Sequence, residues 1–199
     1  AFSAELILEA AEMLDEPCLR LTGGQYLDLS FEKLPAVSLE QYRGMIAGKT
    51  GALIACSARM GGLLGGADPA QLTAWGEFGR LLGEAFQIWD DWLGIWGDAA
   101  LTGKSAESDL ASGKKSYPVC IGLEQSPRFR ARWQQPPVAP EEVPALARFL
   151  EEDGVKGLVL LETERATSAA VEALRRAAPA GAVRATLESL SRSLIGRVK

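Results

Sequence analysis

The sequence contains no histidine, and this absence excludes several kinds of catalytic site. Without imidazole there is no serine–histidine triad, no histidine-based acid–base pair and few of the usual zinc sites. Cysteine is also scarce: Cys18, Cys56 and Cys120 are odd in number and far apart, and no spacing suits a metal. We interpret them as reduced, mostly buried thiols, which indicates a cytoplasmic protein.

Basic stretches and long hydrophobic runs are missing as well. The net charge is −5 and no basic stripe is visible, so we expect no nucleic-acid partner. The most apolar stretch, Gly51 to Ala67, is rich in glycine and is interrupted by Arg59. It is short for a membrane span, so we predict a buried helix and no stable membrane insertion.

Helical patterns account for nearly the whole chain of 199 residues, and no strand signal of useful length or internal repeat is present. We therefore predict one domain and an all-α bundle, whose ligand sites normally lie between facing helices. Pro17 is expected to interrupt the first helix, and Ser38 with Gln41 forms a predicted capping box. Helices are expected over residues 4–14, 19–31, 38–64, 69–96, 141–152, 163–178 and 183–198 and from Pro118, with loops at 33–37, 97–116 and 126–140.

The most informative feature is a pair of adjacent carboxylates, Asp90 and Asp91, inside an apolar, tryptophan-rich helix. On a helical wheel the pair shares one face with Gln87 and Gly94. The opposite face carries Trp89, Trp92 and Trp96, which we assign to core packing or a subunit contact. The pair is either part of a solvated helix face or the ligand set of an oxygen-preferring cation such as Mg²⁺.

Lysines flank this helix on both sides. Lys49, followed by Thr50, lies at the edge of an apolar segment, where it either snorkels to water or faces an anion. Lys104 and Lys114 lie in a segment rich in Gly, Ser and Lys, which is either a plain solvated loop or a loop that closes over a phosphate. Residues 97–105 nearly spell a nucleotide P-loop, but the spacing is one residue too long and a helix precedes them. Acid beside base suggests a metal-bridged anion such as a diphosphate.

The order of these pieces is more specific than any one of them. Gly-Gln-Tyr-Leu-Asp-Leu at 24–29 precedes Lys-Thr at 49–50, and Phe-Gln-Ile-Trp-Asp-Asp at 86–91 follows. Gly-Lys at 103–104, Asp109 and Gly-Lys-Lys-Ser-Tyr-Pro at 113–118 complete the series. From about residue 19 to 119, with a weaker helical match to the end, the chain closely resembles the trans-type polyprenyl diphosphate synthases, which include farnesyl and geranylgeranyl diphosphate synthases.

The resemblance implies an isoprenoid-synthase type of all-α bundle around a deep cavity, usually a homodimer. It implies a Mg²⁺-dependent prenyltransferase of isoprenoid biosynthesis that condenses an allylic diphosphate with isopentenyl diphosphate and releases pyrophosphate. Metal-binding residues implied in this way are Asp90, Asp91 and Asp109. Residues implied to bind the diphosphate or act in catalysis are Lys49, Thr50, Gln87, Lys104 and Lys114, with Gln25 and Asp28 as further substrate-binding residues.

The chain departs from the family pattern at two points. Gly94 stands where the second aspartate-rich motif, Asp-Asp-x-x-Asp, usually has its last aspartate. The first such motif, normally well upstream of Gly24-Gln25, is not found, so we expect residues 1–199 to be the C-terminal part of one synthase domain, without its N-terminal helices and inactive alone. A non-catalytic or regulatory subunit and a class I terpene cyclase are the alternatives, while the lysine set favours the synthase.

Overall fold

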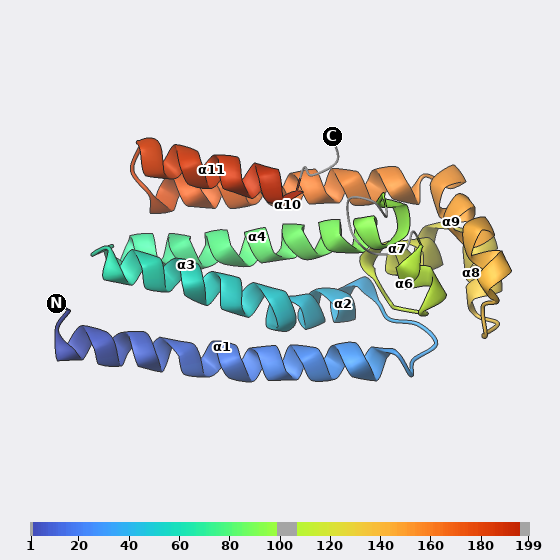
Figure 1. Ribbon diagram of the computed structural model, residues 1–199, viewed down its shortest axis with the longest axis horizontal. Helices are drawn as coiled ribbons and strands as arrows, with labels where there is room; N and C mark the ends of the chain where they lie inside the picture. The colour runs from blue at the N-terminus through green and yellow to red at the C-terminus, as the bar shows by residue number, and fades with distance from the viewer. Residues whose placement is uncertain (1, 99–106, 196–199) are drawn as a thin grey trace.

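Long helices lie side by side in the computed structural model, which describes residues 2–98 and 107–195 (Figure 1). No β-strand occurs in these residues, so the predicted all-α class is confirmed. Short helices gather at one end of the long ones (Figure 1). The long row consists of α1 (Ala4–Phe31), α2 (Leu39–Ile46), the π-helical turn η1 (Ala47–Gly51), α3 (Ala52–Leu64), α4 (Pro69–Trp96), α10 (Val155–Ala177) and α11 (Ala182–Ile195). The short elements are α6 (Ser108–Ala111), α7 (Tyr117–Gln125), α8 (Pro127–Trp133), the 3₁₀ turn η2 (Pro140–Glu142) and α9 (Val143–Glu152).

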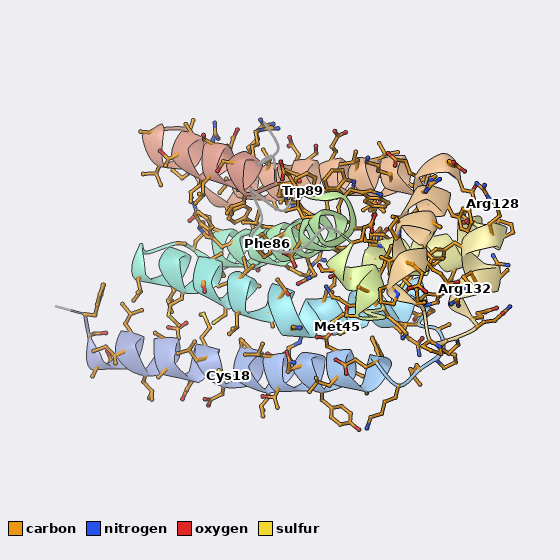
Figure 2. All side chains as sticks on the ribbon, turned by 45° about the vertical axis from the view of Figure 1, so that its right-hand side comes forward. Cys18, Met45, Phe86, Trp89, Arg128 and Arg132 are labelled. Carbon is orange, nitrogen blue, oxygen red and sulfur yellow. The ribbon has the colours of Figure 1, made fainter. Side chains whose placement is uncertain are left out.

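The helix that carries the aspartate pair, α4, is central to the bundle and packs along both α3 and α10. Its buried face includes Ile88, Trp89, Trp92 and Ile95, and the rings of Trp89 and Trp92 stack with centroids 4.9 Å apart. Figure 2 labels Trp89 together with Phe86, which lies on the more exposed part of the same helix. Trp89 and Trp92 therefore belong to the core and Trp96 packs against it, which is the first of the two predicted roles, core packing rather than a subunit contact.

Local capping sets the beginnings of two helices. Ser38 accepts from the backbone N–H of Gln41, and the Gln41 side chain accepts from the backbone of Ser38, as predicted. Asp68 and Gln71 make the same reciprocal pair at the start of α4, where Pro69 occupies the first turn. The beginnings of α2 and α4 are therefore each determined by four or five consecutive residues of the sequence.

A π-helical turn separates α2 from α3 and contains Lys49 and Thr50. At this turn α1 approaches backbone to backbone: a Cβ added to Gly24 would lie 2.2 Å from the Lys49 backbone nitrogen. Single π-turns inside helices are frequent at functional sites because they change the direction of the side chains that follow. The close contact holds Lys49 against α1.

Pro17 does not interrupt α1, contrary to the prediction. A proline inside a helix removes the N–H that would bond the carbonyl four residues earlier, here that of Met13. The thiol of Cys56 on α3 donates to that carbonyl, with Sγ and O 3.4 Å apart, so a tertiary contact replaces the lost hydrogen bond. All three cysteines are free, and Cys56 and Cys120 are buried, whereas Cys18 is exposed.

Three further segments differ from the expected ones. The segment 97–116, expected to be a loop, contains the short helix α6. The segment 126–140, expected to be a loop, contains α8, since Pro127 stands in its first turn and the Ser126 hydroxyl accepts from the backbone of Phe129. Helix α10 begins at Val155, well before residue 163, directly after Gly154 with its positive φ of 81°. Among the described helices none combines the length and apolarity needed to cross a membrane.

Candidate functional site

Asp91 is completely buried and accepts four hydrogen bonds. Its Oδ1 receives Lys114 Nζ at 2.7 Å and Gln87 Nε2 at 3.3 Å. Its Oδ2 receives the hydroxyl of Tyr42 at 2.6 Å and the backbone N–H of Tyr117 at 2.8 Å. A buried carboxylate has lost its hydrogen bonds to water, and these four donors replace them. Asp91 therefore joins α2, α4, α7 and the residues before α7 into one unit.

The network extends from Asp91 in both directions. Thr50 in η1 donates to the side-chain oxygen of Gln87 at 2.7 Å, which orients the Gln87 amide so that its nitrogen faces Asp91. On the other side Lys114 also donates to Oδ2 of Asp109 at 3.2 Å. One ammonium thus bridges two carboxylates that are largely or wholly buried.

The electrostatics of this arrangement keep its donors protonated. Burial by itself opposes the charge on Lys114, but the carboxylates of Asp91 and Asp109 outweigh burial and raise the Lys114 pKa. Burial, followed by the neighbouring charge of Asp91, raises the pKa of Tyr42 well above its usual value. Lys114 stays an ammonium ion and Tyr42 stays a hydroxyl donor at neutral pH.

Gly94 lies directly against the carboxylate of Asp109. A Cβ added to Gly94 would lie 2.5–2.7 Å from the carboxyl atoms of Asp109. The Asp109 carboxylate therefore packs directly on the α4 backbone, in the space into which a side chain at position 94 would extend. A residue from α6 thus brings a carboxylate to the position at which the resemblance implied an aspartate on α4.

Gly94→Ala should destabilise the chain, although alanine is the better helix former by about 0.5–1 kcal/mol. The added methyl would push Asp109 off Lys114, and overpacking of this kind typically costs about 1–3 kcal/mol. We expect a net loss of about 1 kcal/mol or more in urea denaturation. In a chain that already carries Asp109→Ala, the further change Gly94→Ala should cost little stability, because the carboxylate it would displace is gone. If the losses of the two single variants simply add in the double variant, the proposed packing is contradicted.

The other predicted residues lie outside the Asp91 network. Lys49 forms an ion pair with Asp28 across the α1–η1 contact, one residue before Thr50. Gln25 is exposed on α1, and Asp90 is partly buried on α4, next to Asp91. Lys104 lies outside the described residues.

Sequence reasoning missed Tyr42, Arg43 and Tyr117. Tyr42 is 49 positions from Asp91, and no local pattern marks it as a partner. Arg43 pairs with Glu84 at 2.9 Å and with Glu162 at 2.5 Å, and its guanidinium also reaches the Tyr117 hydroxyl at 3.4 Å. These contacts hold α2 against α4, α7 and α10 around the buried carboxylate.

A cation would find only part of a ligand set here. Within residues 2–98 and 107–195 no group of three carboxylate or thiol side chains is placed to hold a metal ion. Both oxygens of Asp91 already accept hydrogen bonds, whereas Asp90 is partly buried beside it on α4, and Asp109 of α6 is buried and bonded to Lys114. Mg²⁺ commonly binds through one or two carboxylates together with phosphate oxygens and water. The residues therefore fit an ion shared with a phosphate-bearing ligand.

Comparison with known proteins gives a consistent result. The family model of the polyprenyl synthetases matches residues 3–148. A short chain isoprenyl diphosphate synthase of Methanothermobacter thermautotrophicus is 38% identical over 123 residues, which are 62% of this chain and 38% of that protein. A polyprenyl synthetase from Streptomyces coelicolor A3(2) superposes with a TM-score of 0.87 at 35% identity, over 94% of this chain and 59% of its own.

A third protein is a geranylgeranyl pyrophosphate synthase from Corynebacterium glutamicum, complexed with isoprenyl diphosphate and magnesium. It superposes with a TM-score of 0.87 at 27% identity, over 98% of this chain and 57% of its own. The chain thus spans about four-tenths to six-tenths of the length of the proteins it matches.

Proposed function

Because the chain belongs to the polyprenyl synthetase family, we propose that it serves Mg²⁺-dependent transfer of a prenyl group from an allylic diphosphate to isopentenyl diphosphate. The observation that carries the proposal is the bridge of Lys114 between Asp91 and Asp109 beside Asp90, with Gln87 and Thr50 linked to it. A site that combines carboxylates for a cation with fixed ammonium groups suits a diphosphate leaving group.

The cation would be held by Asp90 and Asp109, with the remaining positions left for phosphate oxygens and water. When bound, Mg²⁺ supplies stabilisation of the charge that develops on the departing diphosphate. The related synthase from Corynebacterium glutamicum, complexed with isoprenyl diphosphate and magnesium, supports magnesium as the ion. We propose that Asp91, whose oxygens are taken, anchors the site rather than binding the ion directly.

Lysines would hold the diphosphate. Lys114 uses two of its three N–H groups on Asp91 and Asp109 in the described structure, and the third is available to a phosphate oxygen. Lys49 is half-buried beside Asp28 and would donate from the η1 turn. Preorganised cations of this kind stabilise a leaving group as its charge develops, without reorganising during the reaction. By resemblance, Lys104 would add a further cation and Gln25 would line the substrate site.

The domain organisation, the oligomeric state and the location of the protein are also proposals. We infer from the resemblance that residues 1–199 work within one synthase domain and that the protein acts as a cytoplasmic homodimer. The strongly exposed apolar side chains of α1, among them Leu19 and Tyr26 with 74% and 72% of their surface accessible, are consistent with helix contacts to further polypeptide.

Binding of inorganic pyrophosphate tests the site without requiring turnover. Isothermal calorimetry of the 199-residue chain should detect binding with Mg²⁺ present, and EDTA should abolish it, because the ion links the carboxylates to the phosphates. In the protein that contains this chain, incorporation of labelled isopentenyl diphosphate into longer products should show the same dependence. Pyrophosphate binding that ignores EDTA would contradict the metal-bridged site, and metal-dependent binding without incorporation would favour a non-catalytic subunit.

A further inference from the structure

A pocket lies at the end of the molecule where the short helices gather. It is formed where three segments meet: the loop after α1, the residues from α6 to Lys115, and the segment that follows α8 (Figure 1). Its volume of about 470 Å³ is within the range of small-molecule sites. In Figure 2 the labelled Arg128 and Arg132 mark α8, the helix that leads into this region.

The pocket wall combines apolar side chains with a few polar and charged ones. Trp133 at the end of α8 is buried to 6% exposure, and Pro136, Pro137 and Val138 follow it along the wall. Leu110 of α6 closes the pocket from beneath and is fully buried. The two proline rings and the small exposed part of the Trp133 indole form apolar surface at little cost in conformational entropy, so they suit the apolar body of a ligand.

One lysine of the lining, Lys115, forms no ion pair with a described carboxylate. Lys115 is half-buried, its ammonium donates to the carbonyl of Gly113 at 2.9 Å, and it lies 5.9 Å from the centre of the Trp133 ring. Across the described residues no carboxylate oxygen lies within 4.0 Å of it. Burial lowers the pKa of Lys115, and the more distant charge of Glu32 only partly opposes this.

Two other lysines, Lys156 and Lys114, show how the environment of Lys115 differs from that of a paired lysine. Lys156 lies 5.9 Å from the ring centres of Trp92 and Trp96, yet it pairs with Glu151 at 2.6 Å. Lys114, next in sequence to Lys115, pairs with two carboxylates. Of these three lysines, only Lys115 keeps a charge that the described side chains do not neutralise, and a partly desolvated cation favours an incoming anion.

We propose that this pocket binds a small amphipathic anion, with a flat apolar body between Trp133 and the prolines and one anionic group on Lys115. Lys33 on the rim adds a second positive charge, while Glu32 in the lining disfavours a highly charged ligand such as a diphosphate. The pocket is separate from the Asp91 network, since none of that network's side chains lines it. The proposal therefore stands whether or not the chain takes part in prenyl transfer.

The test compares two dyes of nearly the same shape. 8-Anilinonaphthalene-1-sulfonate carries one sulfonate, and N-phenyl-1-naphthylamine lacks it. We expect Lys115→Met to weaken fluorescence-detected binding of the anionic dye by about tenfold, the scale of one charge-assisted contact, and to leave the neutral dye unchanged. Lys156→Met, a lysine in a similar aromatic setting, is the matched control and should change neither.

A second readout locates the dye on the native chain. Saturating anionic dye should reduce acetylation of Lys115 by acetic anhydride, measured by peptide mass spectrometry, and should spare Lys156. If Lys115→Met does not fold, Ala111→Phe fills the pocket from an exposed position of its lining and should block binding equally. Equal affinity of the folded variants and the parent chain for the anionic dye, or an unprotected Lys115, would overturn the proposal and assign the dye to other apolar surface.

Discussion

Asp91→Ala is expected to lower the free energy of unfolding by about 3–5 kcal/mol, the scale measured when one partner of a buried ion pair is removed. The variant would leave the buried Tyr42 hydroxyl and the Tyr117 backbone N–H without their acceptor, and Lys114 would keep only Asp109. An unsatisfied buried donor retains its full desolvation cost, so the losses accumulate at one point in the core. Urea denaturation followed by circular dichroism measures the effect.

Two further variants separate the causes. Asp91→Asn keeps the size of the side chain and part of its hydrogen bonding but loses the charge, so it should fall between the parent chain and Asp91→Ala. Asp15→Ala removes an exposed carboxylate of α1 and should change stability by less than about 0.5 kcal/mol. A loss below about 1 kcal/mol for Asp91→Ala would show that the four hydrogen bonds do not anchor the helices.

Asp90→Ala should reduce the activity much more than the stability. Its side chain is partly exposed, so we expect a stability change of about 1 kcal/mol or less. Prenyl transfer by the protein that contains this chain should fall by about 100-fold or more, because the ion loses a ligand while charge develops on the leaving diphosphate. Incorporation of labelled isopentenyl diphosphate, measured beside the unfolding curve, tests both parts.

Asp90→Ala and Asp91→Ala, measured side by side, separate the two proposed roles. If Asp90 holds the ion and Asp91 holds the helices, rate and stability respond to different residues. Raising the Mg²⁺ concentration should partly restore Asp90→Ala, because a weakened site is refilled by mass action. Full activity in Asp90→Ala, or a collapse of its fold in metal-free buffer, would show that Asp90 does not have the role proposed for it.

Much of the helical architecture could be predicted because it depends on neighbouring residues. The capping pairs at Ser38 and Asp68 lie within four residues, and the apolar spacing of α4 is readable at a period of 3.6. Prediction was wrong where a distant contact decided the outcome: Cys56 accommodates the proline in α1 by bonding the freed Met13 carbonyl. The chain between α7 and α9 was misjudged because its proline-rich composition concealed the cap that begins α8.

The sequence by itself determined the all-α class, the family and the residue types at the candidate site. These follow from helical periodicity and from the order of short motifs, both of which are properties of the chain read in one direction. Asp90, Gln87 and Lys114 were identifiable in this way.

Only the tertiary structure decided which aspartate is buried, what occupies the space beside Gly94, and that Lys115 faces an apolar pocket. Adjacent aspartates look alike in sequence, but Tyr42 and Lys114 reach Asp91 from 49 and 23 positions away. Burial and electrostatic environment depend on such distant partners, and a carboxylate's role follows from them more than from its neighbours in the chain. The division between Asp90 and Asp91 therefore arises from the packing of α2, α4 and α7 around one buried charge.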